Sequence, residues 1–126
     1  MTVTTSESRA GPSGYHPPPF DVAVRSEESS AWVFEVRGEL DLATGPMLKQ
    51  HLEPYNDLSR NNGHPRRVVY LLPELGFMDA SGLHALLTAV DGYDPETITI
   101  REPSSPVRRL LELAGLDSMI EERANQ

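Results

Sequence analysis

The feature that most constrains the fold is a run of five consecutive apolar residues from Val68 to Leu72. A strand with one face in water alternates apolar and polar residues, so an unbroken run predicts a strand covered on both faces, as in a sheet with helical crossovers. Apolar residues then recur at helical spacing, at Leu83, Leu86, Leu87 and Val90. A covered strand followed by an amphipathic helix predicts an α/β fold, in which Val69 and Leu71 are buried.

The rest of the chain predicts the order of the other elements. Residues 20–25 and 32–37 alternate apolar and polar side chains, which is typical of two antiparallel strands. Helices that link the later strands make those strands parallel, with right-handed crossovers. The sequence therefore predicts a four-stranded mixed sheet in the order β-β-α-β-α-β-α, with the helices packed on it. The predicted strands cover 20–25, 32–37, 68–72 and 97–101, and the predicted helices begin at 44–46, 80 and 105.

Prolines and glycines mark the ends of these helices. The first helix begins at Thr44-Gly45-Pro46, because a proline in the first turn loses no hydrogen bond. Pro54 is expected to kink or end that helix near Glu53, and Asn61 to Pro65 is expected to be a loop. Gly115 is expected to end the last helix in a left-handed conformation.

The length of 126 residues indicates a single domain. Residues 1–19 are rich in Ser, Thr, Gly and Pro, and such a composition cannot bury enough apolar surface to offset the entropy of ordering. We expect a disordered tail over 1–19, a folded domain over 20–122 and a short C-terminal tail over 123–126.

Composition narrows the classes of function. The formal net charge is −8, which disfavours nucleic acid and anionic membranes as partners, because phosphate contacts need Lys and Arg. The chain has no cysteine, which excludes disulfides and thiolate metal sites. No apolar run is long enough to cross a membrane, and residues 1–13 lack the apolar core of a secretory signal. We expect a cytoplasmic protein without membrane insertion.

Candidate functional residues gather where two predicted strands end. Asp79 is a good N-cap for the following helix, and Ser81 and Gly82 lie in its first turn. A hydroxyl there can carry a phosphate cheaply, because the helix N-terminus favours an anion. Asp41 is expected to approach Asp79, since both residues leave strand ends at one edge of the sheet. No nucleophile or base accompanies these carboxylates, the four histidines are scattered, and no phosphate-binding glycine motif is present, so we expect neither enzyme activity nor a metal or cofactor.

Three motifs in this order resemble the STAS domain of bacterial anti-sigma factor antagonists. They are Gly38-Glu39-Leu40-Asp41, Phe77-Met78-Asp79-Ala80-Ser81-Gly82-Leu83, and Ser104-Ser105-Pro106-Val107-Arg108-Arg109-Leu110-Leu111 with Ala114-Gly115-Leu116. The resemblance covers residues 20–120. It implies a regulator that binds an anti-sigma factor, usually a serine kinase, and so releases a sigma factor for transcription. It also implies that phosphorylation of a serine at the helix start breaks the complex, and that a phosphatase resets the cycle.

The resemblance places partner contacts on Asp41, Asp79, Ala80, Ser81 and Gly82. In the family pattern the phosphorylated serine directly follows the aspartate, but here Ala80 holds that position. Either Ser81 accepts the phosphate, or this chain is not switched there. Two alternatives stay open: an unphosphorylated STAS subunit of another complex, such as a lipid-transport assembly, and a nucleotide-binding STAS module.

Overall fold

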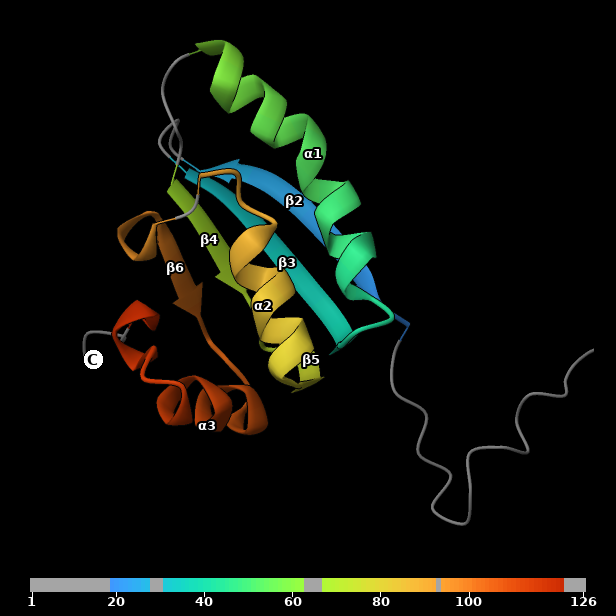
Figure 1. The fold of residues 1–126 in the computed structure, drawn as a ribbon, viewed down its shortest axis with the longest axis vertical. Coiled ribbons are helices and arrows are strands. Elements are labelled where there is room, and N and C mark those ends of the chain that lie inside the picture. The colour runs from blue at the N-terminus through green and yellow to red at the C-terminus, as the bar shows by residue number, and fades with distance from the viewer. Residues whose placement is uncertain (1–18, 28–30, 63–66, 93, 122–126) are drawn as a thin grey trace, which may run out of the picture.

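The computed structural model describes residues 19–27, 31–62, 67–92 and 94–121. They form a mixed sheet with helices along it (Figure 1). The expected tails and most of the expected loop at 61–65 lie outside these residues. None of the described helices is long and apolar enough to span a membrane. In chain order the strands and α-helices are β2 (Asp21–Glu27), β3 (Ala31–Leu40), α1 (Gly45–Asn62), β4 (Arg67–Leu71), β5 (Leu75–Met78), α2 (Ala80–Thr88), β6 (Ile98–Arg101) and α3 (Ser105–Leu113).

The sheet has the strand order β2-β3-β4-β6, with β5 paired separately to β3. Strand β2 runs antiparallel to β3, whereas β3, β4 and β6 are mutually parallel. These directions confirm the prediction that the first strand is antiparallel and that helices connect parallel strands. The register sets Phe34 opposite Tyr70 and Tyr70 opposite Ile100, which aligns large apolar residues across the sheet.

Among the described residues the sheet contains five strands, one more than the four predicted. The additional strand, β5, follows β4 after a short turn and pairs in parallel with the end of β3, from Gly38 to Leu40. Strand β3 can pair first with β4 and then with β5 because Gly38 has a φ angle of 100°. A residue with a side chain would be strained in this backbone conformation. A register shift between Gly38 and Glu39 lies within the pairing of β3 with β5.

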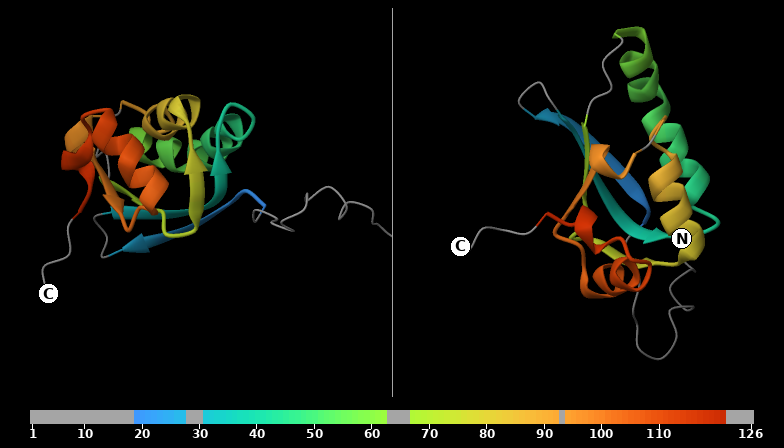
Figure 2. Two further views of the ribbon diagram at one scale, coloured as in Figure 1. Left: turned by 90° about the horizontal axis from the view of Figure 1, so that it is seen from below. Right: turned by 60° about the vertical axis from the view of Figure 1, so that its left-hand side comes forward.

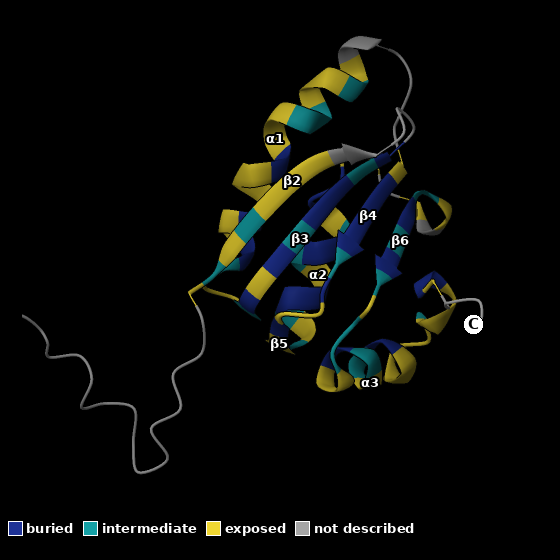
Figure 3. Ribbon diagram, turned by 180° about the vertical axis from the view of Figure 1, so that it is seen from behind, coloured by how far each residue is buried: buried dark blue, intermediate teal, exposed yellow. Residues whose placement is uncertain are grey.

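Helices α1 and α2 lie on one face of the sheet (Figure 2). Seen from the opposite side, β2, β3, β4 and β6 lie in front of these helices, and no helix of the described residues crosses them (Figure 3). We expected both faces of the central strand to be covered; the described helices cover one of them. Val33 and Val69 on this open face are nevertheless only 1% and 0% exposed. Val69 lies between Val33 and Thr99 of the neighbouring strands and forms a small buried cluster with Val33 and Ala31, against which the half-buried Leu71 packs.

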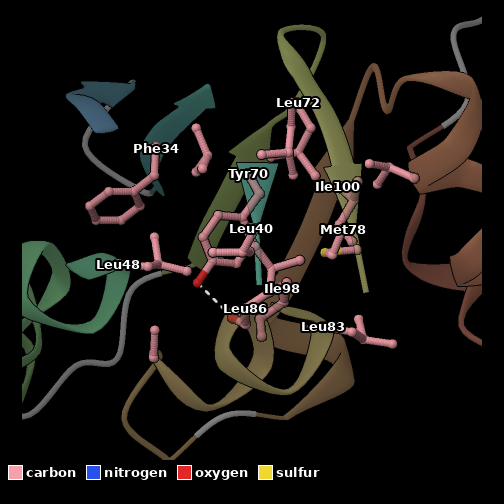
Figure 4. Packing of buried hydrophobic residues seen from close by; sticks show 14 of the residues in the cluster. Phe34, Leu40, Leu48, Tyr70, Leu72, Met78, Leu83, Leu86, Ile98 and Ile100 are labelled. Carbon is pink, nitrogen blue, oxygen red and sulfur yellow. Dashed lines mark hydrogen bonds between the residues drawn. The ribbon is translucent and has the colours of Figure 1, made fainter. Parts of the chain in front are cut away.

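The main core lies between the sheet and its helices (Figure 4). Tyr70 is fully buried there, and its hydroxyl donates a 2.7 Å hydrogen bond to the carbonyl of Leu86 on α2. This bond satisfies the one polar group of the side chain, so burial of the ring carries no unpaired hydroxyl. The same bond fixes the distance between α2 and the middle of the sheet.

Helix α1 continues through Pro54 to Asn62, so it does not end near Glu53. Contacts beyond the proline hold the second half of the helix in place. The ring of Tyr55 packs 4.7 Å from Trp32, between ring centroids. The side-chain amide of Asn56 donates to the carbonyl of Ala89 and accepts from the N–H of Asp91, so it ties α1 to the end of α2. Tertiary packing thus outweighs the local cost of the proline.

The C-terminal elements follow the prediction closely. Strand β6 is preceded by a 3-10 turn over Pro95–Thr97, and α3 begins at Ser105 as expected. Gly115 has a φ angle of 76° and ends α3, which confirms its role. A last 3-10 turn, Asp117–Met119, buries Met119 and brings Ile120 beside Ile100 of β6.

Candidate functional site

Two parallel strands end side by side at the candidate site. Leu40 at the end of β3 is opposite Met78 at the end of β5, and the N–H of Asp79 donates to the carbonyl of Leu40 over 3.4 Å. Asp41 and Asp79 are therefore the next residues along two adjacent strands, as the sequence predicts. Helices α1 and α2 both begin at this end of the sheet (Figure 1).

The Asp79 carboxylate caps α2. It accepts a 2.8 Å hydrogen bond from the N–H of Gly82, and the carbonyl of Asp79 accepts from the N–H of Leu83. Asp79 has extended backbone angles, as an N-cap residue requires. The predicted cap is confirmed, and it leaves Ala80 and Ser81 as the first two residues of the helix.

The Asp41 carboxylate organises the turn that leads into α1. It accepts hydrogen bonds from the N–H groups of Ala43 at 3.0 Å and Thr44 at 3.2 Å. The Thr44 hydroxyl in turn accepts from the N–H of Asp41 and donates to the carbonyl of Glu39 over 2.8 Å. Asp41 and Asp79 thus both act as acceptors that shape the start of a helix.

Two glycines allow the helices to approach closely at this site. A Cβ atom on Gly45 would lie 2.9 Å from the Cβ of Ala85, so the start of α1 touches the middle of α2. Gly82 is buried against the backbone of β3. We expected Gly82 among the partner contacts, but the structure places it beneath the surface, where it shapes the site. Ala80 is exposed and Ser81 is half-buried, so these two residues are accessible.

A groove of about 260 Å³ runs between the starts of α1 and α2. Asp41 and Ser81 line it together with Lys49 from α1 and His84 from α2. The sequence analysis did not identify Lys49 and His84 as site residues. Their spacing could have done so, because Lys49 follows Gly45 by one helical turn and His84 follows Ser81 by three residues.

Leu42 gives the site an apolar contact that the sequence analysis also missed. Its side chain is 78% exposed and lines the same groove. An exposed leucine between polar residues is what a protein-binding surface needs at its centre. We call the surface formed by Asp41, Leu42, Asp79, Ala80 and Ser81 the helix-start face.

The fold and the position of this face define an α/β domain of a known class. The family model of the STAS domain matches residues 23–125, so the chain belongs to the STAS family. This result confirms the resemblance seen in the sequence and the predicted fold class. No curated protein matches the chain.

Solved structures of anti-sigma factor antagonists are similar to this chain. The unphosphorylated antagonist SpoIIAA is 16% identical, with a TM-score of 0.62 over 83% of this chain and 90% of that one. An antagonist from Mycobacterium paratuberculosis is 23% identical, with a TM-score of 0.62 over 85% and 87%. The phosphorylated form of the Bacillus cell fate determinant SpoIIAA is 17% identical, with a TM-score of 0.59 over 83% and 93%. These likenesses show a shared fold.

Proposed function

We propose that this chain is an anti-sigma factor antagonist that binds an anti-sigma factor through the helix-start face. Binding would release a sigma factor for transcription in the bacterial cytoplasm. The observation that carries the proposal is the accessible start of α2, where the exposed Ala80 and the half-buried Ser81 follow the Asp79 cap, together with the exposed Leu42. The similarity of the fold to that of antagonists of known structure supports it.

Ser81 is the proposed site of phosphorylation by a partner of the serine kinase type. It lies in the first turn of α2, where backbone N–H groups and the helix dipole favour a negative charge. Lys49 and His84 line the same groove, and a phosphate on Ser81 could use both as hydrogen-bond donors. These surroundings support a domain that tolerates the phosphate without unfolding.

The partner would not tolerate the same phosphate. A phosphate adds about −1.5 to −2 charges at pH 7, next to a surface that already carries Asp41 and Asp79. A complementary surface that fits a small neutral hydroxyl must then bury an unpaired charge, which is costly. Phosphorylation would therefore dissociate the complex, and a phosphatase would restore binding.

One alternative function, that of a STAS subunit that is never phosphorylated, is supported by a separate observation. Ala80 holds the position at which the family pattern has its phosphorylated serine, and Ala80 is more exposed than Ser81. A chain that is never phosphorylated would bind constitutively, as a STAS subunit of another complex.

Affinity purification of the full chain from its native cytoplasm, followed by intact-mass analysis, tests the proposal. We expect an anti-sigma factor among the captured proteins, and a mass gain of one phosphate after incubation with that partner and ATP. Failure of titrated ATP or GTP to bind the isolated chain would disfavour the nucleotide-binding module. Capture of a transport assembly without a mass gain would favour the constitutive subunit.

Variants at Ser81 locate the switch. Ser81→Ala should bind the partner and resist phosphorylation, whereas Ser81→Asp should bind at least about tenfold more weakly. Ser105→Asp is the matched control, because Ser105 is the exposed first residue of α3, at another helix start. Both aspartate variants should keep the melting temperature of the parent. If Ser81→Asp binds as tightly as Ser105→Asp, Ser81 is not the switch.

A further inference from the structure

The edges of the sheet are protected to different extents. At the β6 edge, the N–H of Glu121 donates to the carbonyl of Ile100 over 2.7 Å, and Arg101 forms an ion pair with Glu121. The carbonyl of Leu75 at the start of β5 accepts a 2.6 Å hydrogen bond from the hydroxyl of Ser104. Elements from the C-terminal part of the chain therefore contact both of these strands.

Strand β2 lacks such cover. Within the described part of the chain, it pairs with β3 and with no other strand. Its seven residues contain no proline, and the side chains of Asp21, Ala23, Val24 and Arg25 are exposed. An edge strand of this length presents a row of N–H and carbonyl groups that can pair with another strand.

The register with β3 shows which face each β2 side chain occupies. Val22 and Val24 lie opposite Val36 and Phe34, which belong to the main core, so both valines are on the helix-bearing face. Residues on alternate positions point to the other face. Asp21, Ala23 and Arg25 therefore lie on the open face. Val24 is 37% exposed at the rim of the core, so it has apolar surface left to cover.

We propose that β2 pairs antiparallel with β2 of a second copy of this chain, about a two-fold axis at Ala23. In this register Asp21 of each copy is opposite Arg25 of the other, which gives two ion pairs on the open face. Val22 of each copy is opposite Val24 of the other on the helix-bearing face. The strand is thus complementary to itself in both charge and apolar surface.

Of the two neighbouring registers, the one with its axis at Val24 is unfavourable. An axis at Val24 would place Asp21 opposite Glu27 of the other copy. Two attractive pairs would then be replaced by two pairs of like charges, which destabilise cross-strand contacts. The proposed contact is small, because it uses one short strand from each copy. We therefore expect a dimer that depends on protein concentration and weakens as salt screens the ion pairs.

Ala23→Lys separates dimerisation from folding. Ala23 is directly opposite Glu35 in its own chain, so a lysine there gains a favourable cross-strand neighbour in the monomer. Across the two-fold axis this lysine would lie directly opposite the same lysine of the second copy, and the two positive charges would repel each other. Sedimentation of the full chain over a range of concentrations should show self-association by the parent, and association at least about tenfold weaker for Ala23→Lys. The control is Gln50→Lys on exposed α1, which adds the same charge and should associate like the parent.

Charge exchange tests the register itself. Asp21→Arg and Arg25→Asp should each weaken association, because each sets like charges opposite one another. The double variant Asp21→Arg/Arg25→Asp should recover most of the parent association, with melting temperatures recorded for all three. A parent that stays monomeric into the millimolar range, an Ala23→Lys variant that associates like the parent, or a double variant weaker than both single variants would overturn the proposal.

Discussion

A Cβ atom on Gly82 would lie 2.1 Å from the carbonyl oxygen of Leu40 and 2.7 Å from its carbonyl carbon. The first turn of α2 is thus in direct contact with the backbone at the end of β3. Both atoms belong to the main chain, so they cannot rotate away as the end of a side chain would. The geometry of the helix-start face depends on this contact.

Gly82→Ala should therefore be strongly destabilising. We expect a loss of about 3 kcal/mol or more in the free energy of unfolding, measured by chemical denaturation, because a packed backbone must move. Gly92→Ala is the control: Gly92 has a φ angle of 61° but open space around it, so the cost there is only that of the left-handed conformation, about 1–2 kcal/mol. Equal losses for the two variants would show that the contact with Leu40 relaxes easily.

Two substitutions at Asp79 distinguish the role of its side chain as a helix cap from the role of its negative charge. Asp79→Ala removes the acceptor for the N–H of Gly82 and should cost about 1 kcal/mol of stability. Asp79→Asn keeps a capping oxygen and should stay close to the parent. Both variants should lose affinity for the anti-sigma factor if the partner contacts the charge. Full affinity in Asp79→Asn would limit Asp79 to a structural role.

Tyr70→Phe should show a stability loss that depends on pH. Burial raises the pKa of the Tyr70 hydroxyl well above its ordinary value, so the folded state keeps the proton. The unfolded chain releases it above pH of about 10. The parent therefore loses stability as the pH rises past that value, by about 1.4 kcal/mol for each further unit.

Tyr70→Phe lacks this group, so its comparison with the parent changes with pH. Near pH 8 the variant should be less stable by about 1–3 kcal/mol, because the carbonyl of Leu86 loses its partner. At pH 11 the difference should shrink by about 1.4 kcal/mol. Urea denaturation of both proteins at the two pH values measures it. A difference that does not change would mean that Tyr70 ionises equally in both states.

Pro54→Ala should stabilise the domain. A proline inside α1 removes one hydrogen bond, and its replacement by alanine should recover about 1–3 kcal/mol, less the entropy that the unfolded chain regains. Pro54 is exposed, so no core contact is lost. Thermal unfolding should show a higher midpoint, with Pro46→Ala as the control in the first turn, where proline is well tolerated. A lower midpoint for Pro54→Ala would contradict this account.

The predicted directions of the strands were confirmed because periodicity and crossover rules act locally. Strand β5 escaped prediction because its four residues, Leu75–Met78, include a glycine and do not alternate cleanly. It is a strand because it pairs with the end of β3 at Gly38, which has a positive φ angle, and that pairing joins residues far apart in sequence. The continuation of α1 past Pro54 likewise depends on Tyr55 and Asn56 meeting distant partners.

The site was predictable in part. Asp79 was identified as a cap from its position before an amphipathic helix, and the structure agrees. The family resemblance placed Gly82 among the partner contacts, but the structure buries this residue. Its burial depends on how closely α2 approaches Leu40, which no local pattern encodes. Lys49 joins Ser81 in one groove only because two helices lie side by side.

The irregular backbone at Gly38 also divides the sheet into two regions that differ in local stability. Beyond it, the strand end that leads into Asp41 pairs only with Leu75, Phe77 and Met78, through a short and irregular register. Local opening costs least where few hydrogen bonds must break together. Amide hydrogens of β5 should therefore exchange with solvent sooner than those of β4, which is held between β3 and β6. The end of the sheet that carries the helix-start face can therefore open locally while the pairing of β4 with β3 and β6 persists.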